Sequence, residues 1–367
     1  MLAQTLFTNE LSGDDRHAWQ TLVGRAAEPN PFFGPAFVQA SADSWGEPAE
    51  LLVIRDKASW LACLPLTRAG RWRRLKPFAH AERWLPEYTY FATPLVDRDA
   101  LPPAVAALAH ALVRDERAAL VVLDPLDADG SVGPGLLTAL EAEGCRPIVY
   151  EEFKRAAVRR RPKPTYLDTV SPKRRKELRR LKRRLEREVG AGLAVEDRSA
   201  QPEACEAFLE MELRSWKGDN GTALASRPED AAFFRALCGQ TGEGGLQILA
   251  LQGGGRIVAM QCNLVQGGVM FGFKVAYERE LARFSPGVLL EVDALEAFHE
   301  RISVDLLDSC AAPDSEPFAW LWPDLRALRT VVVPTRSPLA PAVRAAVLLQ
   351  RVASRRARKR RSSSAVR

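Results

Sequence analysis

The 367-residue sequence contains no apolar run that reaches the roughly 18 residues needed for a membrane-spanning helix. Residues 1–15 have neither a basic segment nor an apolar core, so we expect no secretory signal peptide. The four histidines are scattered along the chain, which argues against a metal-binding cluster and against a histidine-based nucleophile system. These absences favour a cytoplasmic protein without a metal cofactor.

Cysteines are few and widely spaced. No two of the six lie within the spacing of a CxxC motif, which argues against a zinc site and against a disulfide framework. Scattered cysteines of this kind suit a reducing compartment. They are Cys63, Cys145, Cys205, Cys238, Cys262 and Cys310.

The net charge of +6 is unevenly distributed. Residues 154–187 hold sixteen Lys and Arg against three Asp and Glu, and residues 351–361 hold seven Lys and Arg and no acid. Subtracting these two segments from the total leaves −14 for the rest of the chain. The sequence therefore describes an acidic protein with two basic segments, each of which suits a polyanionic partner such as tRNA or an anionic membrane.

The length favours two domains, since domains typically run to about 100–200 residues. We predict an N-terminal domain over 1–157, a C-terminal domain over 158–338 and a basic tail over 339–367. Periodicity predicts helices at 19–27, 35–44, 102–114, 136–143, 202–216 and 228–237. It predicts strands at 50–55, 60–66, 119–123, 145–153, 246–251, 257–264, 304–308 and 328–333. Residues 29–66 and 221–264 share one order of elements, which indicates an internal duplication.

The basic segment contains a well-marked helix over 172–189. Ser171 and Pro172 open it and Gly190 ends it, with a thin apolar stripe at Leu178, Leu181, Leu185 and Val189. Like charges on its other faces repel one another, so binding of a polyanion at 173–187 would relieve the repulsion. The other interpretation is a solvated helix face.

Residues 267–298 combine an apolar strand, a polar loop and a helix. Ser285 suits the N-cap, Pro286 suits the first helical position, and the backbone amides of Gly287 and Val288 are predicted donors. The helix dipole favours negative charge at this end, so the stretch predicts a site for phosphate or pyrophosphate. The alternative is an ordinary strand–helix connection.

Four stretches within 165–310 carry a family resemblance: SPKRRKELRRLKRRLE, RSWKGDNGTAL, QILALQGGGRIVAMQCNL and FGFKVAYERELARFSPGVLL. In order and spacing they resemble the Fem-like acetyltransferase domains of the GNAT superfamily, a group found near bacterial cellulose or exopolysaccharide biosynthesis. The resemblance implies an α+β protein of two tandem GNAT-like folds, each a mostly antiparallel mixed sheet flanked by helices, the first degenerate. It also implies acyl transfer from an acyl-CoA, such as acetyl-CoA, to an amine. Coenzyme A pyrophosphate would bind Arg283, Phe284, Ser285, Pro286, Gly287 and Val288.

The sequence departs from that pattern at two places. The loop before Gly287 has fewer glycines than the usual GNAT pyrophosphate loop, and Fem-type relatives without that loop use aminoacyl-tRNA instead. Ala319 stands where a lysine is expected in relatives. These departures leave the donor open between acyl-CoA and aminoacyl-tRNA.

Acyl transfer from a thioester requires a base for the amine and a proton donor for the thiolate. We predict Asp308, at the end of a strand, as the base acting through water, with a turn-capping role as the alternative. Tyr277 lies at the exit of the central strand, where GNAT proteins often place the proton donor. Lys217 and Lys274 are candidates for binding an anionic substrate, and Trp216 for the wall of the pocket. To Glu291 and Asp293, in the first two turns of the helix, we assign only a favourable interaction with the helix dipole and no catalytic role.

The tail has apolar positions at Leu339, Val343, Val347, Leu348 and Val352 before its basic run. It either lies on an anionic membrane, which would place the protein at the inner membrane face, or packs its apolar side on the domain. For the whole chain we predict an acyl-CoA-dependent N-acyltransferase acting on an amino sugar or exopolysaccharide precursor. The alternatives are a Fem-type aminoacyl-tRNA-dependent transferase and a non-catalytic module that binds polyanions.

Overall fold

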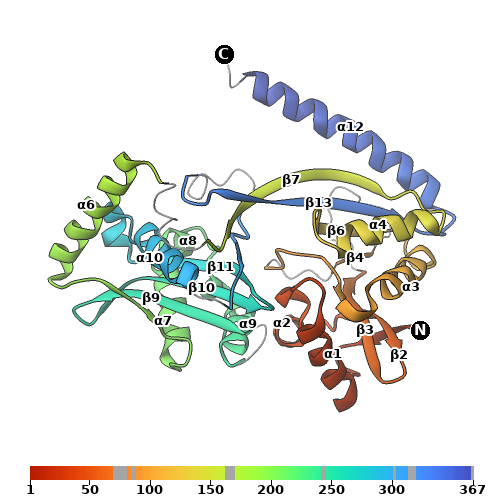
Figure 1. Ribbon diagram of the computed structural model, residues 1–367, viewed down its shortest axis with the longest axis horizontal. Coiled ribbons are helices and arrows are strands. Elements are labelled where there is room, and N and C mark those ends of the chain that lie inside the picture. Colours follow the sequence, from red (N-terminus) through yellow and green to blue (C-terminus); the bar gives the residue numbers. More distant parts are fainter. Residues whose placement is uncertain are drawn as a thin grey trace. The chain divides into compact units, whose positions relative to one another are not determined.

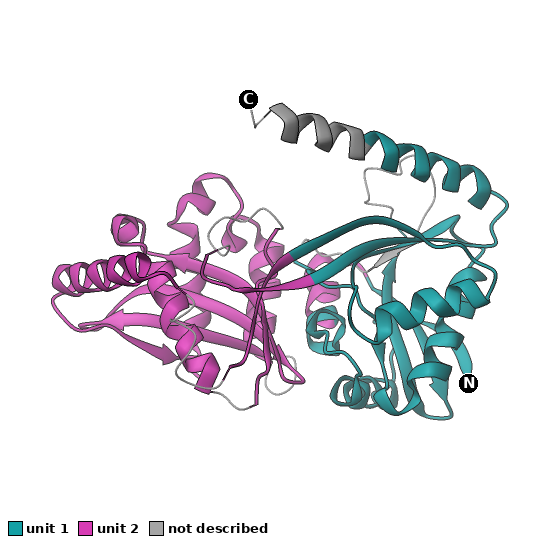
Figure 2. Ribbon diagram, turned by 45° about the horizontal axis from the view of Figure 1, so that its top comes forward, with its two compact units in different colours: residues 1–38, 48–154, 327–367 teal, residues 39–47, 155–326 magenta. Residues whose placement is uncertain are grey.

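The computed structural model describes residues 1–68, 81–83, 88–161, 170–240, 245–300, 303–312 and 320–364. They form two compact units, coloured separately in Figure 2. Unit 1 comprises residues 1–38, 48–154 and 327–367, and unit 2 comprises residues 39–47 and 155–326. The sequence placed 327–338 in the second domain. In the structure these residues belong to unit 1, because their strand pairs with a strand of that unit.

Unit 1 is built on a mostly antiparallel sheet (Figure 1). Its strands run in the order β1 (Leu2–Phe7), β2 (Glu50–Asp56), β3 (Ser59–Thr67), β4 (Ala81–Arg83), β6 (Leu120–Asp127) and β13 (Asp324–Pro334), and β5 (Leu95–Val96) also pairs with β3. Only the pair β4–β6 is parallel among the pairings of these described strands. The helices are α1 (Gly13–Arg25), α2 (Pro35–Trp45, shared with unit 2), α3 (Leu101–Val113) and α4 (Val132–Ala142).

Helix α1 begins earlier than the sequence pattern predicted. The Ser12 Oγ accepts the Asp15 N–H and the Asp15 carboxylate accepts the Ser12 N–H, which is a complete capping box. This cap starts the helix at Gly13, two turns before Trp19. Trp19 is fully buried and donates its Nε1–H to the Phe33 carbonyl at 3.0 Å.

Unit 2 has a sheet of the same kind. Its strands run in the order β7 (Ile148–Arg159, of which residues 155–159 belong to this unit), β12 (Leu306–Asp308), β11 (Val269–Tyr277), β10 (Arg256–Gln266), β9 (Leu246–Gly253) and β8 (Ala194–Asp197). Among these described strands, β11 and β12 pair in parallel and the other neighbours are antiparallel. The helices are α6 (Pro172–Val189), α7 (Glu203–Leu213), α8 (Trp216–Asp219), α9 (Pro228–Cys238) and α10 (Pro286–Glu300).

The two faces of the unit 2 sheet bury different cores. One face packs against α10 and α6 through a large apolar cluster that includes Leu185, Leu289 and Leu295. On the other face, the Phe233 ring of α9 meets the Phe273 ring of β11 with centroids 6.5 Å apart. Alternation along β11 thus directs neighbouring side chains toward different helices.

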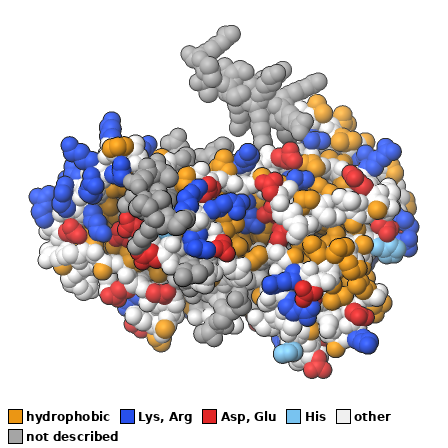
Figure 3. Space-filling view, in the orientation of Figure 1, with side chains coloured by type: hydrophobic (Ala, Val, Ile, Leu, Met, Phe, Trp, Pro, Cys, Tyr) orange, Lys and Arg blue, Asp and Glu red, His pale blue; other side chains and the backbone are white. Residues whose placement is uncertain are grey.

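Helix α6 matches its predicted bounds. Ser171 caps it by accepting the Arg174 N–H, and Gly190 ends it in the left-handed conformation with φ 74°. Leu178 and Leu185 are buried, whereas most of its Lys and Arg side chains are exposed. Figure 3 shows these basic side chains gathered over α6.

The tail forms α12 (Ala340–Ser364). Val343 and Val347 are buried and join an apolar cluster of unit 1 with Leu120, Ile148 and Val332. The first turns therefore pack on the domain, one of the two alternatives. A second row of apolar side chains stays exposed: Leu348 at 37%, Leu349 at 72% and Val352 at 48%. Within the described residues, no helix is both long and apolar enough to cross a membrane.

The duplication extends further than the sequence indicated. In unit 1 the order is β1, α1, η1 (Pro31–Phe33), α2, β2, β3, then β4 and β5, which both pair with β3, followed by η3 (Arg98–Ala100), α3 and β6. In unit 2 it is β8, α7, η4 (Leu224–Ser226), α9, β9, β10, then β11, η5 (Arg279–Phe284), α10, β12, with the short α8 inserted after α7. An ion pair is repeated as well: Arg25 with Asp97 in unit 1, and Arg214 with Glu278 in unit 2.

The strands that follow the two repeats are exchanged. Strand β7 follows the first repeat, but its last residues pair with β12 of unit 2. Strand β13 follows the second repeat and pairs with β6 of unit 1. Each sheet is therefore completed by a strand from the other half of the sequence.

Candidate active site

The predicted anion-binding loop (residues 283–288) connects β11 to α10. Ser285 has φ 53°, in the left-handed region, and its carbonyl accepts the N–H groups of Val288 at 3.0 Å and Leu289 at 3.1 Å. The Val288 amide, predicted as a free donor, is thus engaged within the turn. The carbonyl of the residue before a helix commonly accepts the first intrahelical bonds, so the Val288 amide is not left for a ligand.

Gly287 lies against the end of β11. A Cβ atom at this position would lie 3.4 Å from Tyr277 Cδ1 and 3.7 Å from Val275 Cγ2. Glycine therefore allows the start of α10 to pack closely on the strand. The structure brings together Tyr277, the predicted proton donor, and the predicted anion-binding loop.

Basic side chains of α6 and η5 border this loop. Arg283 pairs with Glu188 of α6 at 2.8 Å and stacks over the Phe284 ring, 4.6 Å from its centroid. Arg184 of α6 lies over the same ring at 5.5 Å. Phe284 and Pro286 are buried, so any contact they make to a ligand would come from their backbone. The loop thus has two exposed arginines beside it.

Lys217 has a structural role that the sequence did not reveal. Its Nζ donates to Glu212 Oε1 at 2.8 Å and to the Val275 carbonyl at 2.8 Å. Glu212 is fully buried, and its other oxygen accepts the Leu224 N–H at 2.8 Å. Because the Lys217 charge neutralises this buried carboxylate, the structure does not favour Lys217 as a substrate-binding residue.

Trp216 and Lys274 were predicted beside Lys217 as substrate contacts. Trp216 is 51% exposed and therefore is not a core residue, and Leu213 and Val275 are also exposed. Lys274 is half-buried on β11 and lies 6.0 Å from the Phe273 ring centroid. Alternation along the strand points Lys274 away from the face that carries Val275 and Tyr277. Lys274 thus lies on the sheet face opposite to the predicted anion-binding loop.

Asp308 ends β12 in a fully buried position. Arg155 pairs with both of its carboxylate oxygens, at 2.5 and 2.6 Å, and Arg326 donates to it at 2.8 Å. Its Oδ1 also accepts the Cys310 N–H at 3.0 Å. Burial raises the pKa of Asp308, but the two arginines outweigh burial and hold this pKa below its usual value. A carboxylate paired in this way is a poor proton acceptor, so the structure does not favour the predicted role as general base.

Strands β11 and β12 pair over a short length only. Residues 269–271 of β11 face residues 306–308 of β12, and the β10–β11 register shifts opposite Cys262 and Asn263. Gly272 follows the paired stretch, and a Cβ there would lie 3.1 Å from the Ser309 carbonyl oxygen. After Phe271, β11 therefore continues to Tyr277 without pairing to its parallel neighbour.

Glu291, which the sequence reading assigned only a dipole interaction, is buried on α10. It is 8% exposed, and burial raises its pKa to about 7, although its polar neighbours Trp322 and Gln261 favour the charged form. The helix periodicity gave no signal for this carboxyl, because Glu291 lies in the first two turns, where acids are common on exposed faces. Because α10 is buried on more than one side, the burial of Glu291 could be recognised only from the fold.

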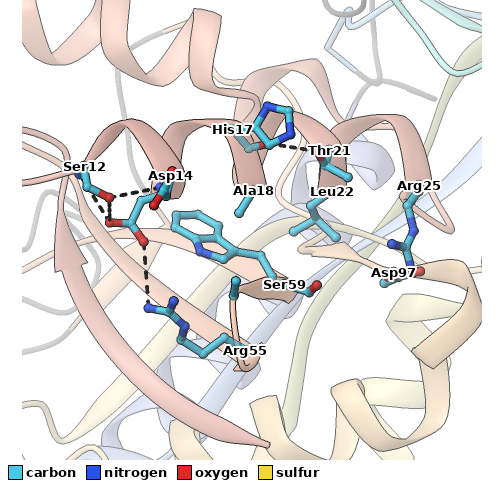
Figure 4. A pocket seen from close by; sticks show the side chains of 13 residues that line it. Ser12, Asp14, His17, Ala18, Thr21, Leu22, Arg25, Arg55, Ser59 and Asp97 are labelled. Carbon is cyan, nitrogen blue, oxygen red and sulfur yellow. Dashed lines mark hydrogen bonds and ion pairs between the residues drawn. The ribbon is translucent and has the colours of Figure 1, made fainter.

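A separate cavity of about 610 Å³ lies in unit 1. Helix α1 and the β2–β3 hairpin line it, and Figure 4 shows Arg25 and Asp97 pointing toward each other at one end. By the order of elements in the two repeats, Asp97 corresponds to Glu278 of unit 2.

Two further observations bear on cofactors. In the described ranges, no group of three or more His, Cys, Asp and Glu side chains could hold a metal ion. All six cysteines are free thiols, and burial raises the pKa of the Cys145 thiol to about 11. Ala319, where relatives are expected to carry a lysine, lies outside the described residues.

Comparisons with known proteins agree with this architecture. Residues 172–316 match the family model described as an acetyltransferase (GNAT) domain. No match is found among curated proteins. The C-terminal domain of a putative lysylphosphatidylglycerol synthetase from Agrobacterium fabrum is similar in structure, with 17% identity, a TM-score of 0.56 and coverage of 93% of this chain and 95% of that one.

Two other solved structures are similar over most of their length. FemX has 11% identity and a TM-score of 0.58, with coverage of 90% of this chain and 97% of that one. A conserved protein of unknown function from Bacteroides thetaiotaomicron has 10% identity and a TM-score of 0.55, with coverage of 91% and 100%. At these identities the similarity establishes the fold and not the substrate.

Residues 172–316 thus match a GNAT acetyltransferase domain, and this match supports acyltransferase activity. The predicted fold class is confirmed: an α+β protein with mostly antiparallel β-structure flanked by helices in each unit, the first unit repeating the element order of the second.

Proposed function

We propose that the protein is an acyl-CoA-dependent N-acyltransferase, with acetyl-CoA as the simplest donor and an amino sugar or exopolysaccharide precursor as the acceptor amine. The observation that carries this proposal is the junction of β11 and α10. There Tyr277 packs on Gly287 at a helix N-terminus, with Arg283 and Arg184 beside it. A helix N-terminus bordered by arginines suits a pyrophosphate.

The residues at this junction fit the reaction that such a donor undergoes. The amine nitrogen attacks the thioester carbonyl carbon, the C–N bond forms and the C–S bond breaks. The leaving thiolate then needs a proton, and Tyr277 at the end of β11 is our candidate to supply it. Arg283 and Arg184 would hold the phosphates, and the absence of a side chain at Gly287 would let them approach the helix backbone.

The experiment is a titration of the purified full chain with acetyl-CoA and with free coenzyme A, by calorimetry. Gly287→Glu places a side chain and a negative charge at the start of α10. We expect micromolar binding by the wild type and at least a hundredfold weaker binding by this variant. Pro102→Glu is the matched control, because Pro102 is the second residue of α3, the helix that corresponds to α10 in unit 1. Folded wild type that binds neither ligand, or equal loss in both variants, would refute the proposal.

A second candidate donor is aminoacyl-tRNA, as in Fem-type transferases. The observation that favours it is α6, whose exposed Lys and Arg side chains continue from the anion-binding loop along the helix. Arg179, Arg183 and Arg187 are exposed on this helix. Their replacement by Glu should weaken tRNA binding and reduce its salt dependence, measured at two salt concentrations. Unchanged binding by this triple variant would refute a role for α6 as the tRNA-binding surface.

The tail is the second basic segment and the proposed contact with an anionic membrane. Leu348, Leu349 and Val352 form an exposed apolar row on α12, and the sequence after it is rich in arginine. Sedimentation with vesicles containing phosphatidylglycerol should carry down the wild type and not a Leu348→Glu, Leu349→Glu double variant. Equal sedimentation of both would refute membrane contact through this row and with it a position at the inner membrane face.

A further inference from the structure

A buried polar group lies beneath the first turns of α10, within a core that is otherwise apolar. Glu291 lies one helical turn beyond Gly287 and is 8% exposed. It interacts with Gln261 of β10, which is 5% exposed, and with Trp322, which is 3% exposed. Gln261 is opposite Val275 in the β10–β11 ladder, and Asn263 is opposite Gly272. Glu291 therefore lies over the part of β11 that runs from the end of its pairing with β12 toward Tyr277.

Two acceptor atoms in this group lack a partner. Glu291 Oε1 and Gln261 Oε1 are inaccessible to solvent and make no hydrogen bond with the described residues. The Gln261 amide nitrogen is already used, since it donates to Asn263 Oδ1 at 3.2 Å. Asn263 in turn donates to Gln247 at 3.4 Å, and Gln247 donates to Asp197 at 3.0 Å. This row of contacts fixes the Gln261 side chain with its oxygen available.

A donor that carries more than one N–H could satisfy both of these acceptors. An unpartnered buried acceptor costs about 1–3 kcal/mol, so a purely structural site would be expected to satisfy both. The acceptor amine of an acyltransferase is such a donor, as its ammonium or amino group brings two or three N–H bonds. Among the described residues, no charged side chain contributes to the pKa shift of the Glu291 carboxyl. Burial and the two polar neighbours, Trp322 and Gln261, account for it.

We propose that Glu291 is the catalytic base of the transferase and that Gln261 positions the acceptor amine beside it. This inference rests on the proposed function, since it assigns a residue of the same reaction. As the amine nitrogen forms its bond to the acyl carbon, one N–H proton passes to the Glu291 carboxylate. The C–S bond breaks, and the thiolate takes the Tyr277 proton. Both residues then return to their starting states by exchange with solvent after the products leave.

The burial of Glu291 on α10 explains how a carboxyl can act as a base here. A base works best when its pKa is close to the operating pH, and burial on α10 moves that of Glu291 in this direction. The charged and titratable groups on the elements packed around α10 are already engaged or lie elsewhere. Lys182 of α6 is paired with Asp293 at 2.8 Å, and Asp308 is paired with Arg155 and Arg326. Tyr277 lies at the opposite end of the same turn, against Gly287.

The test compares Glu291→Gln with Glu296→Gln, an exposed position of the same helix. Release of coenzyme A thiol is followed with acetyl-CoA and glucosamine as the probe amine, over pH 5 to 9. We expect Glu291→Gln to lose about 10²- to 10⁴-fold in kcat with acetyl-CoA binding unchanged. The wild-type rate should rise with pH through about 7, since the base must be ionised, and Glu296→Gln should follow the wild type.

A second readout separates this inference from the proposed donor. In full-length protein with carbon-13-labelled glutamate, the Glu291 carboxyl signal is the one missing from Glu291→Gln. It should titrate near pH 7 and shift when glucosamine is added. If the wild type binds no acetyl-CoA but this shift occurs, the donor is wrong and the acceptor site stands. If this signal does not shift when glucosamine is added, or if Glu291→Gln has the kcat of the wild type, Glu291 is not the base.

Discussion

The same junction of strand and helix occurs twice in this chain, and its two versions differ in one respect that matters for function. In unit 1 the Asp97 carboxylate accepts the Asp99 N–H at 3.0 Å and pairs with Arg25, directly before α3. The second and third residues of α3 are Pro102 and Pro103, which have no N–H to offer. In unit 1 the acid therefore caps η3, and the start of α3 that follows has few backbone donors left.

In unit 2 the corresponding acid, Glu278, makes no capping hydrogen bond to η5 and is held by Arg214 at 3.4 Å. A longer connection of η5 and Ser285 then leads to α10, whose second residue is glycine instead of proline. Duplicated folds can thus keep an ion pair while the helix start that follows it loses its backbone donors in one copy. The difference explains on physical grounds why unit 1 is expected to be degenerate.

The largest expected effect concerns the aspartates that end β12 and β6. Asp308 neutralises Arg155 and Arg326, whereas Asp127 accepts the Asp129 and Gly130 N–H groups at 2.9 and 2.8 Å. Asp308→Ala should lower the free energy of unfolding by about 3 to 5 kcal/mol, because it leaves buried arginines without a partner. Asp127→Ala should cost about 2 kcal/mol. Urea denaturation of both variants checks this, and equal losses would contradict the comparison.

The next largest effect is the pH dependence of stability that Glu291 gives to unit 2. Unit 1 lacks this carboxyl, because α3 has Ala106 at the position that matches Glu291. Its folded pKa of about 7 lies above the ordinary value of 4.5, so the protonated form stabilises the fold. This stability is fully present below pH 4.5 and is lost as the pH rises through about 7, by about 3 kcal/mol in all. Relative to the wild type, Glu291→Gln should therefore gain stability as the pH is raised to 9. Thermal unfolding at several pH values measures this, and a constant difference between the two proteins would contradict it.

A smaller loss is expected at Lys217. Lys217→Ala leaves the buried Glu212 carboxylate without its cation, which should cost about 2 to 3 kcal/mol. Its control is Lys217→Ala combined with Glu212→Gln, which should recover part of the loss. If Lys217 binds substrate instead, the single variant would keep its stability and raise the KM for the acceptor. Denaturation and kinetics on the same samples decide between these outcomes.

Trp216 should give the smallest change in stability. Because the side chain is half exposed, Trp216→Ala should alter the free energy of unfolding by no more than about 0.5 kcal/mol. A lower kcat/KM at unchanged stability would assign Trp216 to the substrate site that unit 2 keeps and unit 1 lacks. A loss of several kcal/mol would show that the tryptophan is part of the core.

Sequence patterns located most elements because local rules decide them. Ser171, Pro172 and Gly190 fix α6 through its caps, and alternation fixes the β9–β10 hairpin. The start of α1 was predicted too late because the capping box at Ser12 precedes the apolar pattern. The pairing of β13 with β6 could not be predicted, because antiparallel partners far apart in sequence leave no local signal.

The site was predicted in part for the same reason. Gly287 and Tyr277 are neighbours because strand and helix are consecutive, so spacing alone indicated their proximity. The roles of Lys217 and Asp308 depend on Glu212, Arg155 and Arg326, which only the fold brings to them. The presence of a charged residue, without knowledge of its ion-pair partners, was therefore a poor guide to which residues bind substrate. The sequence also gave no reason to select Glu291, because its burial depends on the tertiary fold.

The exchanged strands also set the timing of folding during synthesis. Arg329 of β13 donates to the Ala128 carbonyl just after β6, across a separation of 201 residues. When the ribosome has finished residues 1–154, β6 still has an open edge, and β6 must wait for β13 until nearly all of unit 2 has been made. An open strand edge of this kind pairs readily with other chains. The nascent protein is therefore expected to depend on chaperones over this interval and to be most prone to aggregation when translation stalls before β13.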